Sequence, residues 1–115
     1  MSTITVTNIK ATGETASRAV SGVAAAWCQY NADGSVDNSI NVSSCVDVST
    51  GSQEPNFTNH MSSANYSGVC TTQNNTDIGF STVAADRYRT LVRLLSTQGA
   101  YDRNNNMLAI HGDLA

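Results

Sequence analysis

Few side chains of this chain could carry covalent or acid–base chemistry. They are three cysteines, two histidines and nine carboxylates in 115 residues. Nucleophilic catalysis needs a Ser, Cys or Thr beside a base that a third group orients. The two histidines are His60, in a polar stretch, and His111, near the C-terminus, and there is no Gly-x-Ser-x-Gly elbow. The sequence therefore predicts a protein that is not an enzyme.

The acidic residues form no pattern that singles out a catalytic pair. Hydrolysis of a sugar needs two carboxylates at a defined separation, and no spacing distinguishes two among Asp33, Asp37, Asp47, Glu54, Asp77 and Asp86. The segment from Asn31 to Asp37 places side-chain oxygens at alternate positions, as a calcium loop does. Its glycine is misplaced, however, and no later Glu completes the ligand set. We interpret it as a hairpin turn and expect neither a metal nor a cofactor.

The cysteines Cys28, Cys45 and Cys70 lack the Cys-x-x-Cys spacing of a zinc or redox site, and their number is odd. We expect small buried thiols in a chain made in a reducing cytoplasm. Cys45 and Cys70 are the pair to test for a disulfide.

Trp27 is the one side chain whose type suggests recognition, because an exposed indole can stack on a sugar ring. A lone Trp in a thin core is more often part of that core, and we favour the buried alternative. Trp27 and Tyr30 are the candidate contacts for a glycan or a protein partner.

Composition excludes several partners. The net charge of −3 and the pI near 5.0 leave no basic footprint for nucleic acid. No apolar run approaches the ~18 residues of a membrane span, and the N-terminus lacks the order of a signal peptide. Only 13% of residues are charged, about half the usual share, so copies of the chain repel one another little. We expect sister subunits to bury apolar surface that the thin core of one chain leaves exposed.

The candidate residues lie in or beside segments in which apolar and polar residues alternate, as they do in strands. Asp33-Gly34 between two such segments predicts a tight β-hairpin. The first strand is expected from about Val20 to Tyr30, with Cys28 and Tyr30 on one face and Trp27 on the other. The second is expected to run unbroken through Ile40, Val42, Val46 and Val48, all on one face.

The later part of the chain gives further strands. Pro55 predicts an edge or a loop because it cannot donate to a ladder, and Phe57 is the expected core residue beyond it. Strands are expected around 65–71 and 107–111, with a polar bend at 73–77. Segment 87–96 fits helical spacing as well as strand spacing, and its surroundings favour a strand with its arginines facing outward.

Short strands about ten residues apart, divided by turn residues, indicate an all-β fold. We predict a small antiparallel β-sandwich, jelly-roll-like, over residues 18–115, preceded by an extended N-terminal arm over residues 1–17. The arm alternates like a half-buried strand through Ile4 and Val6. With Ile9, these are the positions expected to dock on a neighbouring subunit or on a larger particle.

The order of several blocks resembles a β-rich module of tail-fibre and other virion proteins of tailed, particularly marine, bacteriophages. The blocks are Ser2–Val6, Trp27–Asn31, Ser39–Ser44, Asn56–Thr58, Met61–Tyr66 and Leu108–Ala115. Together they span nearly the whole chain. The sequence departs from the family pattern at Gln53-Glu54-Pro55 and at Cys28 and Cys45.

The resemblance implies a non-enzymatic virion structural protein of the tail-fibre type, made in the host bacterial cytoplasm. It also implies a homotrimer whose N-terminal arm binds other virion proteins and whose β-domain faces outward, toward the host. Capsid decoration is an alternative within the same class. A carbohydrate-binding module that uses Trp27 to hold host surface glycan is an alternative from another class. A polysaccharide hydrolase has no positive feature in the sequence.

Overall fold

The computed structural model describes residues 2–9, 12–13, 15, 18–19 and 23–115, and these contain strands, turns and loops but no helix. The strands are β1 (Asn8–Ile9), β2 (Arg18–Ala19), β3 (Ala24–Tyr30), β4 (Val36–Ile40), β5 (Val42–Ser49), β6 (Ser52–Phe57), β7 (Ser67–Thr71), β8 (Thr76–Val83), β9 (Tyr88–Leu94) and β10 (Asn106–His111). Within this part of the chain, no helix that could cross a membrane is present.

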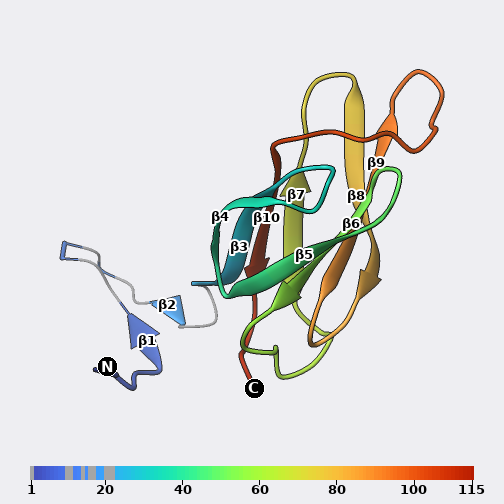
Figure 1. The fold of residues 1–115 in the computed structure, drawn as a ribbon. Helices are drawn as coiled ribbons and strands as arrows, with labels where there is room; N and C mark the ends of the chain where they lie inside the picture. Colours follow the sequence, from blue (N-terminus) through green and yellow to red (C-terminus); the bar gives the residue numbers. More distant parts are fainter. Residues whose placement is uncertain (1, 10–11, 14, 16–17, 20–22) are drawn as a thin grey trace.

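Two antiparallel four-stranded sheets pack face to face (Figure 1). Sheet 1 has the order β4-β3-β10-β7, and sheet 2 has the order β5-β6-β9-β8. The first and last strands of the sandwich, β3 and β10, lie side by side. The predicted small antiparallel β-sandwich is thus confirmed. The short strands β1 and β2 pair only with each other, in the arm that precedes the sandwich.

The predicted hairpin at Asp33-Gly34 connects β3 to β4. The backbone N–H of Asn31 donates to Ser35 O at 2.9 Å, and Gly34 N–H donates to Asn31 O at 3.0 Å. Gly34 has a φ of 84°, which favours glycine. A Cβ at this position would also lie 2.6 Å from the carbonyl oxygen of Cys45. The hairpin therefore depends on glycine both for its turn and for its close approach to β5.

The sequence predicted one unbroken second strand, and this was wrong. It breaks at Asn41, whose φ is 59°, and continues as β5 in the opposite sheet. The side-chain amide of Asn41 stabilises this change of sheet through hydrogen bonds. Nδ2 donates to Ala25 O at 3.1 Å and to Asn59 O at 3.0 Å, while Oδ1 accepts from Asn59 N at 2.7 Å. Asn tolerates the left-handed region better than a branched residue does. The chain can therefore change sheets here without a glycine.

The faces of this segment also differ from the predicted alternation. Ile40, Val46 and Val48 are exposed by 54%, 46% and 40%, whereas Val42 and Cys45 pack against the core. The register of β5 against β6 shifts between Val42 and Ser44, which changes the face that later residues present.

Pro55 was predicted at an edge or in a loop, and this was wrong. It lies buried in β6, between β5 and β9. The ladder from β6 to β9 holds at Ser52 and Gln53 and resumes only as a bridge from Asn56 to Arg87. Pro55 thus occupies the gap in this ladder, where no N–H donor is needed.

The core is small, as the composition predicted. It contains Ala26, Cys28, Tyr30, Phe57, Met61, Tyr88, Leu108 and Ile110. The ambiguous segment 87–96 forms strand β9, with Tyr88, Thr90 and Val92 buried and Arg89 and Arg93 on the opposite side. Strands β7 and β10 also lie where they were predicted. Strand β8 was not predicted.

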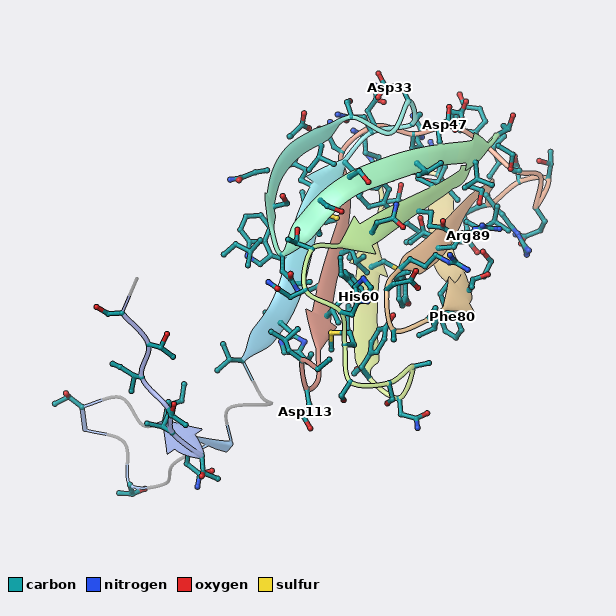
Figure 2. The ribbon with its side chains drawn as sticks, turned by 60° about the horizontal axis from the view of Figure 1, so that its bottom comes forward. Asp33, Asp47, His60, Phe80, Arg89 and Asp113 are labelled. Carbon is teal, nitrogen blue, oxygen red and sulfur yellow. The ribbon has the colours of Figure 1, made fainter. Side chains whose placement is uncertain are left out.

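The arm differs from the half-buried strand that its alternation indicated. Residues 2–7 form no strand, and the side chains of Ile4, Val6 and Ile9 are exposed by 85%, 46% and 40%. Ile9 belongs to β1, which projects away from the sandwich (Figures 1 and 2). The predicted start of the first long strand at Val20 lies outside the described residues, and β3 begins at Ala24.

Candidate functional site

Trp27 lies on the outer face of sheet 1, opposite the core. The burial of β3 alternates strictly: Ala26, Cys28 and Tyr30 are buried, whereas Ala25, Trp27 and Gln29 lie on the other side and are only partly buried. The expectation that Trp27 forms part of the core is therefore wrong. Its indole is half-buried on a sheet face that a partner could reach.

Four apolar residues line up across this face. Trp27 pairs with Ile40 on one side and with Ala109 on the other, and Ala109 pairs with Val69. The residues come from all four strands of sheet 1, and we call them the apolar row. Ile40 and Val69, at its two ends, are exposed by 54% and 59%. Met107, also on the outer side of β10, is exposed by 50%.

The apolar row lies in a sheet with little charge. The four strands of sheet 1 contain one charged residue, Asp37, at the far end of β4 from Ile40. A sheet face that meets only water usually carries polar and charged side chains. The outer face of sheet 1 therefore has the character of a contact surface.

Tyr30, the second candidate for glycan or partner contact, cannot serve that role in this fold. It is fully buried on the core side of β3. Its hydroxyl lies 2.6 Å from Oγ1 of Thr90 on the opposite sheet. Tyr30 therefore joins the two sheets, and of the two predicted contact residues only Trp27 is accessible.

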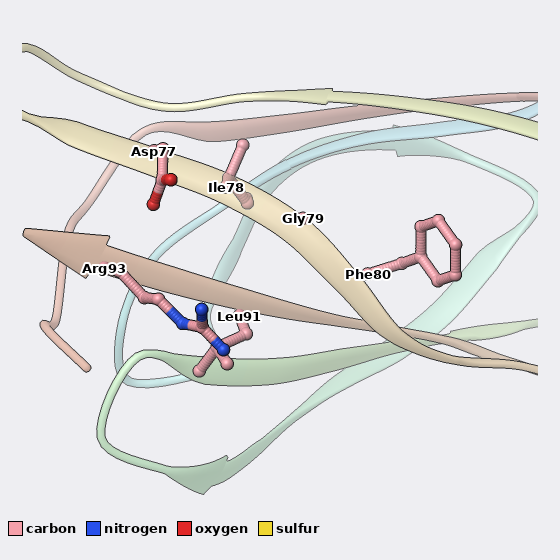
Figure 3. A pocket seen from close by; sticks show the side chains of 6 residues that line it. All are labelled: Asp77, Ile78, Gly79, Phe80, Leu91 and Arg93. Carbon is pink, nitrogen blue, oxygen red and sulfur yellow. The ribbon is translucent and has the colours of Figure 1, made fainter. Parts of the chain in front are cut away.

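The outer face of sheet 2 is different, because it carries a carboxylate, Glu54, that pairs with two arginines. Nε and Nη2 of Arg89 both lie 2.7 Å from Oε2 of Glu54, and Arg87 Nε lies 3.7 Å from the same oxygen. Farther along this face, a shallow groove of about 200 Å³ lies between β8 and β9 (Figure 3). Gly79 leaves space there above Leu91, and Asp77 and Arg93 lie toward one end.

The residues first considered for chemistry do not assemble into a reactive group. The side chains of the β3–β4 turn bond to one another: Asn31 Nδ2 donates to Asp37 Oδ1, and Ser35 Oγ donates to Asp33 Oδ1. His60 is exposed, and its backbone carbonyl accepts from the N–H of Ala115 at 2.9 Å; Figure 2 shows it away from Asp33 and Asp47. Over residues 2–9, 12–13, 15, 18–19 and 23–115, no group of three or more His, Cys, Asp or Glu side chains could hold a metal ion.

The thiols are poor nucleophiles in this environment. Burial raises the pKa of the Cys28 thiol, and that of Cys45, from 9.0 to about 12. Burial also raises the pKa of Cys70, and a hydrogen bond with Tyr88 acts in the opposite direction. The thiolate is the reactive form, so these cysteines are almost wholly protonated near neutral pH. All three cysteines are free; Cys28 is buried, as predicted, whereas Cys45 and Cys70 are only partly buried.

Sequence reasoning found Trp27 but missed the apolar row. Ile40 was assigned to a face shared with Val46 and Val48, and Ala109 and Val69 drew no attention as contact residues. Ile40 meets Trp27 across the β3–β4 hairpin, but Ala109 meets Trp27 and Val69 only through pairings between strands that are distant in the chain. Their exposed apolar side chains indicate a contact surface only once the register of the strands is known.

Comparisons of this chain with protein-family models, with curated proteins and with solved structures found no match. The resemblance to virion modules therefore stays a prediction from the sequence.

Proposed function

We propose that this chain is a non-enzymatic structural subunit that assembles with copies of itself, as a bacteriophage virion appendage of the tail-fibre type. The observation that best supports the proposal is the apolar row on an almost uncharged sheet face. A self-sufficient monomer gains nothing from exposing it. A subunit of a repeated assembly buries it and gains about 25 cal/mol for each Å² removed from water.

Two further features support an assembling subunit. The N-terminal arm exposes Ile4, Val6 and Ile9, apolar side chains with which it can bind a neighbouring subunit or another virion protein. The low charge over the whole chain limits repulsion between copies. The β-domain faces outward, and the virion is the proposed location.

The mass of the full chain in solution tests self-association. A trimer at micromolar concentration supports the proposal, whereas a monomer at every accessible concentration contradicts it. Imaging of intact particles then separates the two virion roles, because density on the head lattice would indicate capsid decoration in place of a tail appendage.

Glycan recognition is the second candidate function, and the position of Trp27 favours it. The indole lies half-buried on an outer face, and on the same face the neighbouring pair Gln29 and Asn38 supplies amide groups that can bond to hydroxyls. We expect a glycan array to show binding that Trp27→Ala abolishes without loss of the β-sheet circular dichroism spectrum. Absence of binding by the wild-type chain would exclude this candidate.

A further inference from the structure

We propose that the outer face of sheet 1 receives the N-terminal arm of a second copy of this chain, so that each copy gives one arm and receives one. This inference rests on the self-assembly proposed above. It adds the identity of the two surfaces that meet and the way in which the assembly closes.

The receiving surface is the apolar row. It crosses three inter-strand spacings, about 14 Å, from Ile40 on one edge strand to Val69 on the other. Ala109 lies between Trp27 and Val69. Its side chain is the smallest of the four, and larger apolar side chains stand on both sides of it. A narrow extended segment can place one apolar side chain against Ala109 between these larger groups.

The arm has the properties of the occupant. Residues 2–9 read STITVTNI, and an extended chain of eight residues measures about 26 Å, enough to cross the row. Ile4 and Val6 are two residues apart, so they point to the same side of an extended chain. They are among the exposed apolar side chains of the molecule. Figures 1 and 2 show the arm directed away from its own sandwich.

Charge favours this face over the other. The segment from Ser2 to Ile9 carries no charged side chain, and the strands of sheet 1 carry only Asp37. The strands of sheet 2 carry five charged residues, among them the paired Glu54 and Arg89. An apolar arm on that sheet would remove paired charges from water without replacing their hydration. Docking on sheet 1 has no such penalty.

The geometry also determines the symmetry. An arm on a face is a heterologous contact, since two different surfaces meet, and it closes into a ring when the rotation allows. A ring of three copies gives the proposed trimer. Contact between two identical faces would be isologous and would give a dimer, so the mass of the assembly distinguishes these arrangements.

Trp27 is the only tryptophan and lies within the row, so its fluorescence reports the docking directly. In the full-length wild-type chain we expect a trimer with a blue-shifted emission and weak quenching by acrylamide. The arm variant Ile4→Asp/Val6→Asp and the face variant Val69→Lys should each raise the concentration of half-assembly by about tenfold or more. Both should expose Trp27 to the quencher.

A matched control and a rescue complete the experiment. Leu95→Lys places the same charge at a position exposed to a similar extent, 55%, in the loop after β9, and it should leave the assembly unchanged. A synthetic peptide of residues 2–9 should protect Trp27 of the arm variant again, in a saturable manner. The peptide should not protect Trp27 when Val69→Lys is also present.

Three results would overturn the inference. A trimer that persists in both the arm and the face variants shows that other surfaces hold the assembly, and the proposed function then survives without this contact. A dimer that needs the face but not the arm shows pairing of identical faces. A monomer whose arm shields its own Trp27 shows docking within one chain and removes the proposed self-assembly as well.

Discussion

The phenol oxygen of Tyr30 in β3 lies 2.6 Å from Oγ1 of Thr90 in β9, and this contact joins the two sheets inside the sandwich. Thr90 Oγ1 also donates to the carbonyl oxygen of Gln53 at 3.2 Å. The Tyr30 hydroxyl is therefore the donor to Thr90. All three residues are fully buried, so these polar groups have no access to water and depend on one another.

Replacing Tyr30 with Phe should lower the free energy of unfolding by about 1 kcal/mol, because one buried hydrogen bond is lost while Thr90 keeps its bond to Gln53. Urea unfolding followed by circular dichroism measures the change. Tyr101→Phe is the control, since Tyr101 is 39% exposed. Equal effects of the two substitutions would mean that the cross-sheet bond does not stabilise the fold.

Asn41 should be hard to replace, for two separable reasons. Asn41→Gly keeps the positive φ but loses the bonds to Ala25 and Asn59, so we expect a loss of about 1–2 kcal/mol. Asn41→Ala loses the bonds and also strains the backbone, which should cost about 1 kcal/mol more. The control is Asn75→Gly, at an exposed position with a φ of 63°, where stability should change by less than about 0.5 kcal/mol. If the Ala and Gly variants of Asn41 unfold at the same urea concentration, the backbone conformation is not limiting.

Gly68 and Gly79 should respond differently to the same substitution. A Cβ at Gly68 would lie 2.7 Å from the Tyr88 ring and 3.0 Å from the Ile110 side chain, so Gly68→Ala should destabilise the protein by about 1–3 kcal/mol. A Cβ at Gly79 meets nothing within 4 Å, and Gly79→Ala should be neutral or slightly stabilising because it reduces the entropy of the unfolded chain. Thermal unfolding of both variants tests the pair, and a Gly68→Ala variant as stable as the wild type would show that Tyr88 moves aside freely.

Stability should fall in alkaline solution. The pKa of Cys28 is raised from 9.0 to about 12 in the folded protein, chiefly by burial and to a smaller extent by Cys45. A raised pKa means that the folded state holds its proton longer than the unfolded state does. The contribution of Cys28 is therefore complete below about pH 9 and is lost as the pH rises from there toward 12, at up to about 1.4 kcal/mol per pH unit.

Urea unfolding under reducing conditions between pH 7 and pH 10.5 should show a plateau followed by this decline. Cys28→Ala should make the decline shallower, although Cys45 and the buried tyrosines keep part of it. An identical slope in the two proteins between pH 9 and pH 10 would contradict a buried, protonated thiol at position 28.

Much of the fold followed from local patterns. The alternation around Cys28 and Tyr30 predicted that these two residues share one face of β3 and that Trp27 lies on the other, and Asp33-Gly34 predicted the turn after it, because side-chain direction in a strand and turn geometry are properties of neighbouring residues. Strand β8 was missed because the apolar residues Ile78 and Phe80 stand among small and polar neighbours, and Phe80 is 66% exposed in the folded protein. The position of Pro55 was predicted wrongly because a proline fits inside a sheet only where the ladder to the neighbouring strand has a gap, and that neighbour, β9, is distant in the chain.

The sequence by itself determined the all-β class, the thin core and the scarcity of charge, since these depend on composition and on the period of two along each strand. Only the tertiary structure decided that the chain changes sheets at Asn41, that Tyr30 points inward and that Trp27 points outward. It also decided that Ile40, Trp27, Ala109 and Val69 form one row. The physical reason is register: which residues become neighbours across a sheet depends on hydrogen bonds between strands far apart in the chain, and no local pattern encodes them.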